Sequence, residues 1–311
     1  MKEEIQRLNK EAEANFRRNP ARAEELARKA QALAHEIGDR AGLAESWLNL
    51  ASVCLRTERY AEGINAAREA LTLFTELDDI RGKVRAFQQM GNCHREIGEM
   101  NEALFAFQES LKWAEHIGDK NLLASILNNI GVIHSILADY PTTLECFLKS
   151  LALFQELGDR YGEALARCNI GIVYEYNREY ENALKEYQAA LALFESLNLK
   201  KETAGTLRNI GIAYRALNDF ENARHALEKS LRLLEEINSL YGIARGIART
   251  KNSLALVYEK KGEDERAIEL YCEALAIGEQ VSDKRLIATV CLNLGRLYSK
   301  KQGIKGDERG N

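Results

Sequence analysis

The sequence predicts an all-α protein, specifically a right-handed α-solenoid, or superhelix, of stacked antiparallel helix pairs. Apolar residues recur at spacings of three and four, which is the periodicity of a helix with one buried face. With only two prolines in 311 residues, long uninterrupted helices are permitted. A polar junction also recurs every 40 residues, at Gly38-Asp39, Asp78-Asp79, Gly118-Asp119 and Gly158-Asp159. A period between 20 and 50 residues is typical of arrays in which each repeat packs only on its neighbours.

One repeat is expected to contain two helices joined by a short polar turn. Residues 124–134 show the helical pattern, residues 137–140 form the turn, and a second amphipathic helix occupies about 143–157. The whole array is predicted to span residues 1–301, followed by a disordered polar tail at 302–311. The repeats are placed at about 1–38, 39–78, 79–118, 119–158, 159–198, 199–238 and 239–282, with a half repeat at 283–301.

The junctions between repeats have a physical explanation in their residue types. Glycine accepts the left-handed conformation that ends many helices, and asparagine at 198 and 238 tolerates it better than most residues. The aspartates at 39, 79, 119 and 159 are expected to cap the next helix, as are Ser239 and Asp283. Leu199 has no such acceptor, so its junction is expected to be weaker.

Small residues occupy one position in the middle of each first helix. Since a mid-helix glycine costs about 1 kcal/mol relative to alanine, its recurrence indicates that the second helix approaches closely there. A matching small position is expected on the second helix, at Ala103, Ala183, Ala223 and Ala267. The small residues of the first helix are Ala51, Gly91, Gly131, Gly171, Gly211, Ala255 and Gly295.

These positions together resemble the tetratricopeptide repeat over roughly residues 20–300. The small residue, a tyrosine three residues later (as at Tyr174) and the aromatic residue before the second helix (as at Tyr180) fit its pattern, although the usual 34-residue unit is stretched to 40. This longer form is similar to arrays in mitotic-spindle adaptors and to sensory arrays of bacterial signalling proteins. The entry segment beginning at Pro20 is similar to the latter. The resemblance implies that the first helices line a concave, partner-binding face.

Composition and motifs exclude several classes of function. The net charge of −4 offers no basic surface for nucleic acid, and no apolar run approaches the length of a membrane helix. No secretory signal is seen at the N-terminus, and the six cysteines form no C-x-x-C pair, so an intracellular, cytoplasmic protein with reduced thiols is expected. Signature motifs of nucleotide-binding, hydrolase and metalloprotease sites are absent. We expect neither catalysis nor a cofactor or metal.

The candidate partner-binding residues form rows along the first helices. A row of amides offers donors and acceptors at a regular pitch, which suits the backbone of an extended peptide; alternatively the amides bond the neighbouring repeat. A central apolar row suggests a hydrophobic anchor site, unless neighbouring helices cover it. The amide row includes Asn49, Gln89, Asn129, Asn169 and Asn209, and the apolar row is Val132, Ile172, Ile212 and Leu256. Asn92, Asn128, Tyr176, Arg208, Arg215 and Asn252 complete the set.

The sequence thus predicts an interaction scaffold or adaptor that binds a partner peptide or helix, as a regulatory or sensory module of a signalling system. The alternative is a small-molecule-sensing regulatory domain. Two irregularities in the sequence also concern its function. The apolar last helix suggests a longer protein, or self-association through that helix. Four extra residues near Gly246 are either a tolerated insertion or a local protrusion used by a partner.

Overall fold

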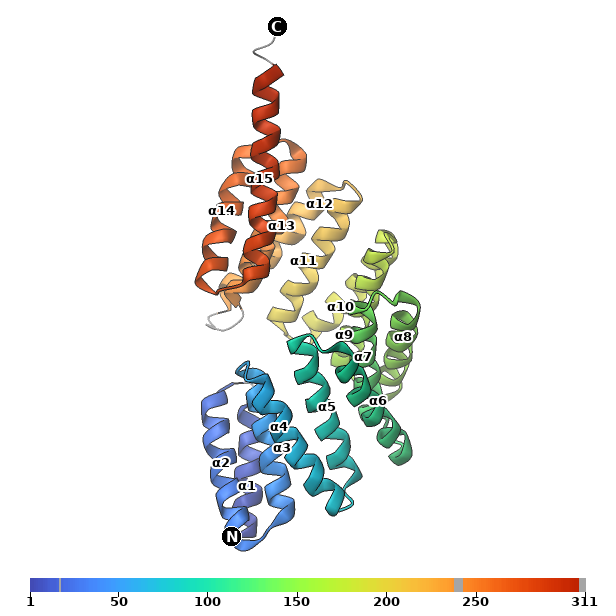
Figure 1. Ribbon diagram of the computed structural model, residues 1–311. Coiled ribbons are helices and arrows are strands. Elements are labelled where there is room, and N and C mark those ends of the chain that lie inside the picture. The colour runs from blue at the N-terminus through green and yellow to red at the C-terminus, as the bar shows by residue number, and fades with distance from the viewer. Residues whose placement is uncertain (17, 238–242, 308–311) are drawn as a thin grey trace. The chain divides into compact units, whose positions relative to one another are not determined.

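The computed structural model describes residues 1–16, 18–237 and 243–307, and the regular secondary structure within them is helical throughout (Figure 1). The all-α prediction is therefore confirmed. The helices of the described residues are α1 (Lys2–Asn15), α2 (Pro20–Ile37), α3 (Arg40–Arg56), α4 (Tyr60–Glu76), α5 (Ile80–Ile97), α6 (Met100–Ile117), α7 (Lys120–Ile136), α8 (Tyr140–Leu157), α9 (Arg160–Tyr176), α10 (Tyr180–Ser196), α11 (Lys200–Ala216), α12 (Phe220–Glu236), α13 (Ile243–Lys261), α14 (Asp264–Gln280) and α15 (Lys284–Asp307).

The helices belong to two compact units, Met1–Asp159 and Arg160–Asn311, which we call unit 1 and unit 2. Within each unit every helix packs against the next one along the chain (Figure 1). We call the odd-numbered helices A helices and the even-numbered ones B helices. Neighbouring A helices also touch, as α3 touches α5 in unit 1 and α11 touches α13 in unit 2. Each unit is thus a stack of helix pairs, the α-solenoid arrangement that the repeat predicts.

Most of the junctions that the structure describes show the predicted chemistry. Gly38, Gly118 and Gly158 have φ angles of 69°, 62° and 68°, in the left-handed region, and Asn198 takes the same conformation at 55°. The cap aspartates accept backbone N–H bonds: Asp39 and Asp79 from the third residue beyond, and Asp119 from the amides of Asn121 and Leu122. Asp283 accepts from the backbone N–H of Leu286.

The junction at Leu199 differs from those that an aspartate caps. The Leu199 side chain makes no capping hydrogen bond, and instead packs in a cluster with Phe194 and Ala164. The predicted roles of Asn238 and Ser239 lie outside the described residues.

The mid-helix glycines do mark a close approach between the helices of a pair, but the group that fills the space differs from the expectation. A Cβ at Gly91, Gly131, Gly171 or Gly211 would lie only 2.5–2.9 Å from a side chain of the following B helix, sixteen residues later. The residues that enter this space are Phe107, Phe147, Tyr187 and Leu227, respectively. The paired small residues of the B helix are buried but are not the main cause, because a large side chain needs the space that glycine leaves.

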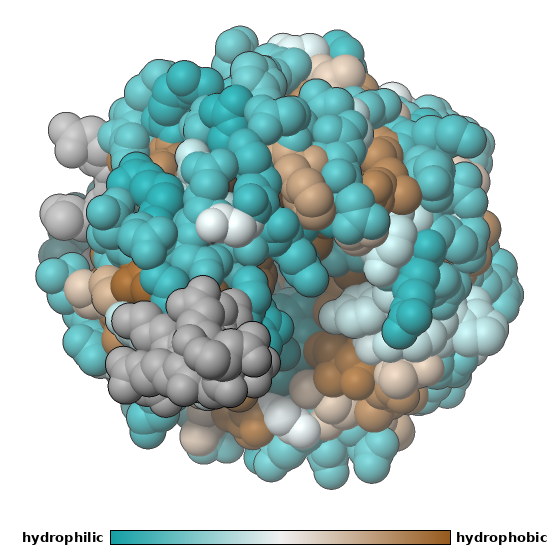
Figure 2. Space-filling model, turned by 90° about the horizontal axis from the view of Figure 1, so that it is seen from above, coloured by the Kyte–Doolittle hydropathy of each residue, from teal (hydrophilic) through white to brown (hydrophobic). Residues whose placement is uncertain are grey.

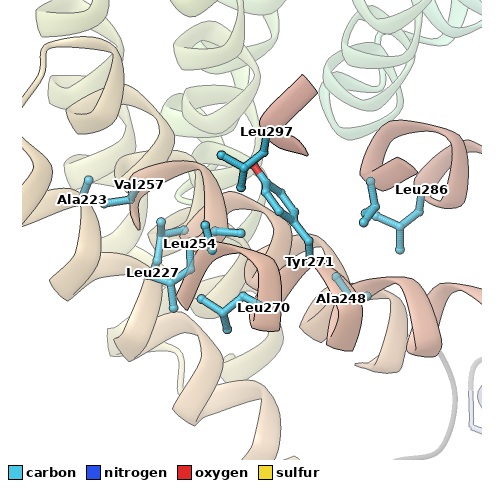
Figure 3. Packing of buried hydrophobic residues seen from close by; sticks show 13 residues of the cluster. Ala223, Leu227, Ala248, Leu254, Val257, Leu270, Tyr271, Leu286 and Leu297 are labelled. Carbon is cyan, nitrogen blue, oxygen red and sulfur yellow. The ribbon is translucent and has the colours of Figure 1, made fainter. Parts of the chain in front are cut away.

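The core of each unit runs between the A and B helices. In unit 2 its largest cluster joins α12, α13, α14 and α15, with Leu227, Leu254 and Leu270 grouped together and Tyr271 beside Leu297 (Figure 3). On the face seen in Figure 2, hydrophobic residues reach the surface in small areas separated by hydrophilic ones. The core therefore holds the A and B helices of each unit together.

The C-terminal region departs from the prediction. Helix α15 continues to Asp307, so residues 302–307 are helical where a disordered polar tail was expected. The segment holds no proline to end the helix, and a polar sequence is no obstacle to helix formation in itself. Leu292 and Tyr298 of α15 are 74% and 47% exposed. Of the insertion, Gly246 lies in the first turn of α13, and residues 238–242 before it are outside the described part of the chain.

Candidate partner-binding faces

The first amide of the predicted row serves the fold. Asn49 on α3 is only 9% exposed, and its side-chain amide donates to the backbone oxygen of Asn9 at 3.0 Å and to its Oδ1 at 3.2 Å. Asn9 in turn donates to the backbone oxygen of Gly42 at 2.9 Å. These bonds fasten α1 to α3. Sequence reasoning missed Asn9, although it stands 40 residues before Asn49 and therefore in the same phase.

The remaining candidates of unit 1 are half-buried on α5 and α7: Gln89, Asn92, Asn128, Asn129 and Val132. The Oε1 atom of Gln89 is buried and accepts no hydrogen bond from the described residues. The neighbouring Gln88 donates to Ser125 Oγ across α5 and α7 at 3.2 Å. The A-helix face of unit 1 is thus lined by amides, some of which bridge adjacent repeats.

Unit 2 carries three of the four predicted apolar residues, on successive A helices. Ile172 packs at the margin of a cluster that includes Tyr187 and Ile210, and Leu256 packs at the margin of the C-terminal cluster. Ile212 is likewise half-buried. Each of the three side chains is thus partly packed and partly accessible. Val132 belongs to unit 1, so the row is divided between the two units.

A row of charged residues lies one turn further along the A helices of unit 2. Tyr187 and Tyr271 on the B helices donate hydrogen bonds to Glu175 Oε2 and Glu259 Oε2, at 3.0 and 2.9 Å. Arg215 lies on the A helix between those that carry Glu175 and Glu259, and its positive charge attracts Glu175. The Nε atom of Arg215 is buried and has no hydrogen-bond partner among the described residues. The candidate Tyr176, next to Glu175, is 61% exposed.

Burial raises the pKa of Glu175 above its usual value, because the loss of hydration outweighs the bond from Tyr187 and the attraction of Arg215 and Arg208. A carboxyl whose pKa is raised on folding stabilises the protein below its unfolded pKa, and this contribution is lost as the pH rises through the raised value. We therefore expect Glu175→Gln, which keeps an acceptor for Tyr187, to raise the melting temperature at pH 7. The gain should disappear on acidification below the pKa of an unperturbed glutamate. A lower melting temperature at pH 7 would show that the carboxylate is stabilised as a charge.

Arg208 and Asn209 are neighbours at the centre of unit 2. Arg208 is half-buried, its Nη2 donates to Asn209 Oδ1 at 3.3 Å, and its Nε is buried without a hydrogen-bond partner in the described structure. Burial, together with the charge of Arg249, lowers the pKa of this guanidinium. Further along the row, Asn252 accepts from the amide of Asn293 at 3.0 Å, so α13 and α15 are also joined through amides. Asn169 is half-buried on α9.

The His, Cys, Asp and Glu side chains of the described residues were the other candidates for a site. They contain no group of three or more His, Cys, Asp and Glu side chains arranged to hold a metal ion. His94 and His134 instead face the carboxylates of Glu99 and Asp139, at 2.6 and 3.1 Å. Among the helices that the structure describes, none has the length and apolar character needed to cross a membrane.

Several solved structures share the fold of this chain. The apo form of RapI matches with a TM-score of 0.71 and 16% identity, over 90% of this chain and 99% of that one. A signal transduction ATPase with a tetratricopeptide repeat sensor from Pyrococcus horikoshii gives 0.71 and 15%, over 91% and 44% of the two chains. A Rap protein complexed with competence and sporulation factor gives 0.69 and 15%, over 93% and 80%. At these identities the likeness establishes the fold. No curated protein matches the chain.

Family models bear directly on the repeats. A model described as tetratricopeptide repeat matches residues 42–116, 122–196 and 164–236, and a second model of the same description matches 252–285. The matched segments contain the mid-helix glycines and the B-helix side chains that fill the space beside them, which are the features that define the packing of each pair. Since the matches cover well over half of the sequence, the chain belongs to the tetratricopeptide repeat family.

Proposed function

We propose that this chain is a protein-interaction module whose A-helix faces bind a peptide or helix of a partner protein. The observation that carries the proposal is the arrangement in unit 2, where Ile172, Ile212 and Leu256 stand half-exposed on successive A helices. Amides flank them at Asn169 and Asn209. Apolar anchors beside hydrogen-bonding groups are what a partner segment needs, since the anchors supply affinity and the amides pair its backbone.

We further propose that the module serves a signalling system as its adaptor or sensory part. Two structural neighbours support this assignment through their own descriptions: one is a repeat sensor of a signal transduction ATPase, and another is a Rap protein bound to competence and sporulation factor. The role of this chain would be to recognise a segment of a partner, with no chemistry of its own.

The amide contribution is tested by replacing Asn129, Asn169 and Asn209 together with alanine. If the amides pair the backbone of a partner segment, the triple variant should bind at least about tenfold more weakly, because each lost hydrogen bond contributes about 0.5–1.5 kcal/mol. Binding is measured by titration calorimetry with the partner identified by affinity capture.

A matched control replaces three exposed amides of B helices, Asn101, Gln108 and Gln188, with alanine. This control should bind as the wild type does. Equal affinities for the two triple variants, both with wild-type helical content by circular dichroism, would show that the amide row plays no part in recognition.

A further inference from the structure

A hollow beside Arg208 carries a more specific assignment within the proposed function. Its volume is about 160 Å³, and it lies between α11 and α13 with Leu234 of α12 on one side. Cavities of that size hold guests as large as benzene, so a carboxylate group fits easily. Its lining residues are Lys201, Ala204, Gly205, Arg208, Leu234, Gly246 and Thr250.

The hollow exists because α11 carries glycine at position 205. The corresponding positions 40, 80, 120 and 160 residues earlier are Leu165, Ser125, Arg85 and Glu45, all with side chains. A Cβ added at Gly205 would meet no atom within 4 Å. Unlike the glycines at 171 and 211, this one therefore accommodates nothing from its own chain. A mid-helix glycine costs about 1 kcal/mol relative to alanine, and here no packing contact compensates for it.

The charged residues that line the hollow are both cationic. Lys201 and Arg208 line it, and its described lining residues include no carboxylate. Arg249 adds a repulsive charge to Arg208, although Arg249 itself pairs with Asp283 at 3.3 Å. The more distant Glu175 attracts the guanidinium, but no hydrogen bond to it satisfies the Nε atom. A half-buried guanidinium with a buried, unpaired Nε donor and a cationic neighbour is the environment that an added carboxylate stabilises, since arginine can bind both carboxylate oxygens at once.

We propose that this hollow receives the side-chain carboxylate of an aspartate or glutamate in the bound partner segment, with Arg208 as its main contact. The assignment rests on the proposed function, since it presupposes a peptide on the A-helix face. Ile212, one turn beyond Arg208 on α11, would hold an apolar residue of the same segment. The partner is thus expected to combine an acidic residue with a nearby apolar one.

The test selects peptides from a displayed library of random 12-residue sequences on the immobilised full chain. We expect the wild type to enrich an acidic residue at a fixed distance from an apolar one. The best peptide is then remade with glutamine or asparagine in place of its acidic residue. The amide peptide should bind the wild type about tenfold or more weakly than the acidic peptide, as expected for a charged hydrogen-bonded pair. The Arg208→Gln variant should bind the two peptides almost equally.

Two further variants locate the effect. Gly205→Leu introduces the residue found at the corresponding position 165, which fills the hollow while Arg208 is retained. This variant should lose the preference for acidic peptides. Arg232→Gln removes an exposed arginine of α12 and should retain it. Peptides selected without any acidic preference, or a preference that survives in Gly205→Leu, would overturn the assignment while the proposed function stands. Failure to select any peptide would overturn both.

Discussion

Replacing both Ile172 and Ile212 with glutamate is expected to abolish capture of the partner, with affinity falling by roughly a hundredfold or more. Apolar side chains at the centre of an interface commonly contribute about 2 kcal/mol each, and each glutamate would also carry a charge into an apolar contact. The two residues lie on the neighbouring A helices α9 and α11 of one unit. The measurement is side-by-side affinity capture with the wild type and the double variant, read by mass spectrometry.

The control for this prediction concerns folding, since Ile172 also contacts the cluster around Tyr187. The double threonine variant, Ile172→Thr and Ile212→Thr, keeps the branched shape without the charge and should show an intermediate loss of affinity. Wild-type helical content in both variants is required. Undiminished capture by the folded glutamate variant would contradict a binding role for the apolar row.

Replacing Gly171 with valine is expected to destabilise the protein by about 3 kcal/mol, near the upper end of the range for overpacked cores. A Cβ at this position would lie 2.5 Å from a ring carbon of Tyr187, which is completely buried and hydrogen-bonded to Glu175. Moving this ring aside would disturb the close-packed core around it. The measurement is urea unfolding followed by circular dichroism.

Gly205→Val is the matched control, because it makes the same change in the middle of α11 where no atom lies within 4 Å of the new Cβ. Its stability should equal or slightly exceed that of the wild type, since valine is a better helix former than glycine. Equal losses in the two variants would refute the view that the recurrent glycine exists to admit a B-helix side chain.

The period of the sequence predicted the framework because its signals are local. Gly38, Gly118 and Gly158 end helices for a reason that belongs to the residue itself, as does the capping by Asp39 and Asp79. The turns inside the repeats carried fewer such signals in the sequence. Glu58, Ala138 and Arg178 adopt positive φ without any residue preference that reveals it, because the packing of the two helices imposes that conformation.

The candidate site was predictable only in part. Phase placed Asn49, Asn129 and Asn209 in one row, but phase does not tell which amide meets another helix. Asn49 is held by Asn9, whereas Asn129 is half-exposed. The hollow at Arg208 depends on the missing side chain of Gly205. A sequence pattern shows that the side chain is absent, but it does not show whether another group fills the space.

Site-directed photo-crosslinking determines whether a partner segment lies on the A-helix face. Tyr176, 61% exposed at the end of α9, is replaced with p-benzoylphenylalanine, an aromatic residue that crosslinks on illumination. Phe105, 63% exposed on the B helix α6, is replaced in the same way as a control. We expect a crosslink between the captured partner and position 176 and none at position 105. A partner crosslinked at 105 and not at 176 would contradict it.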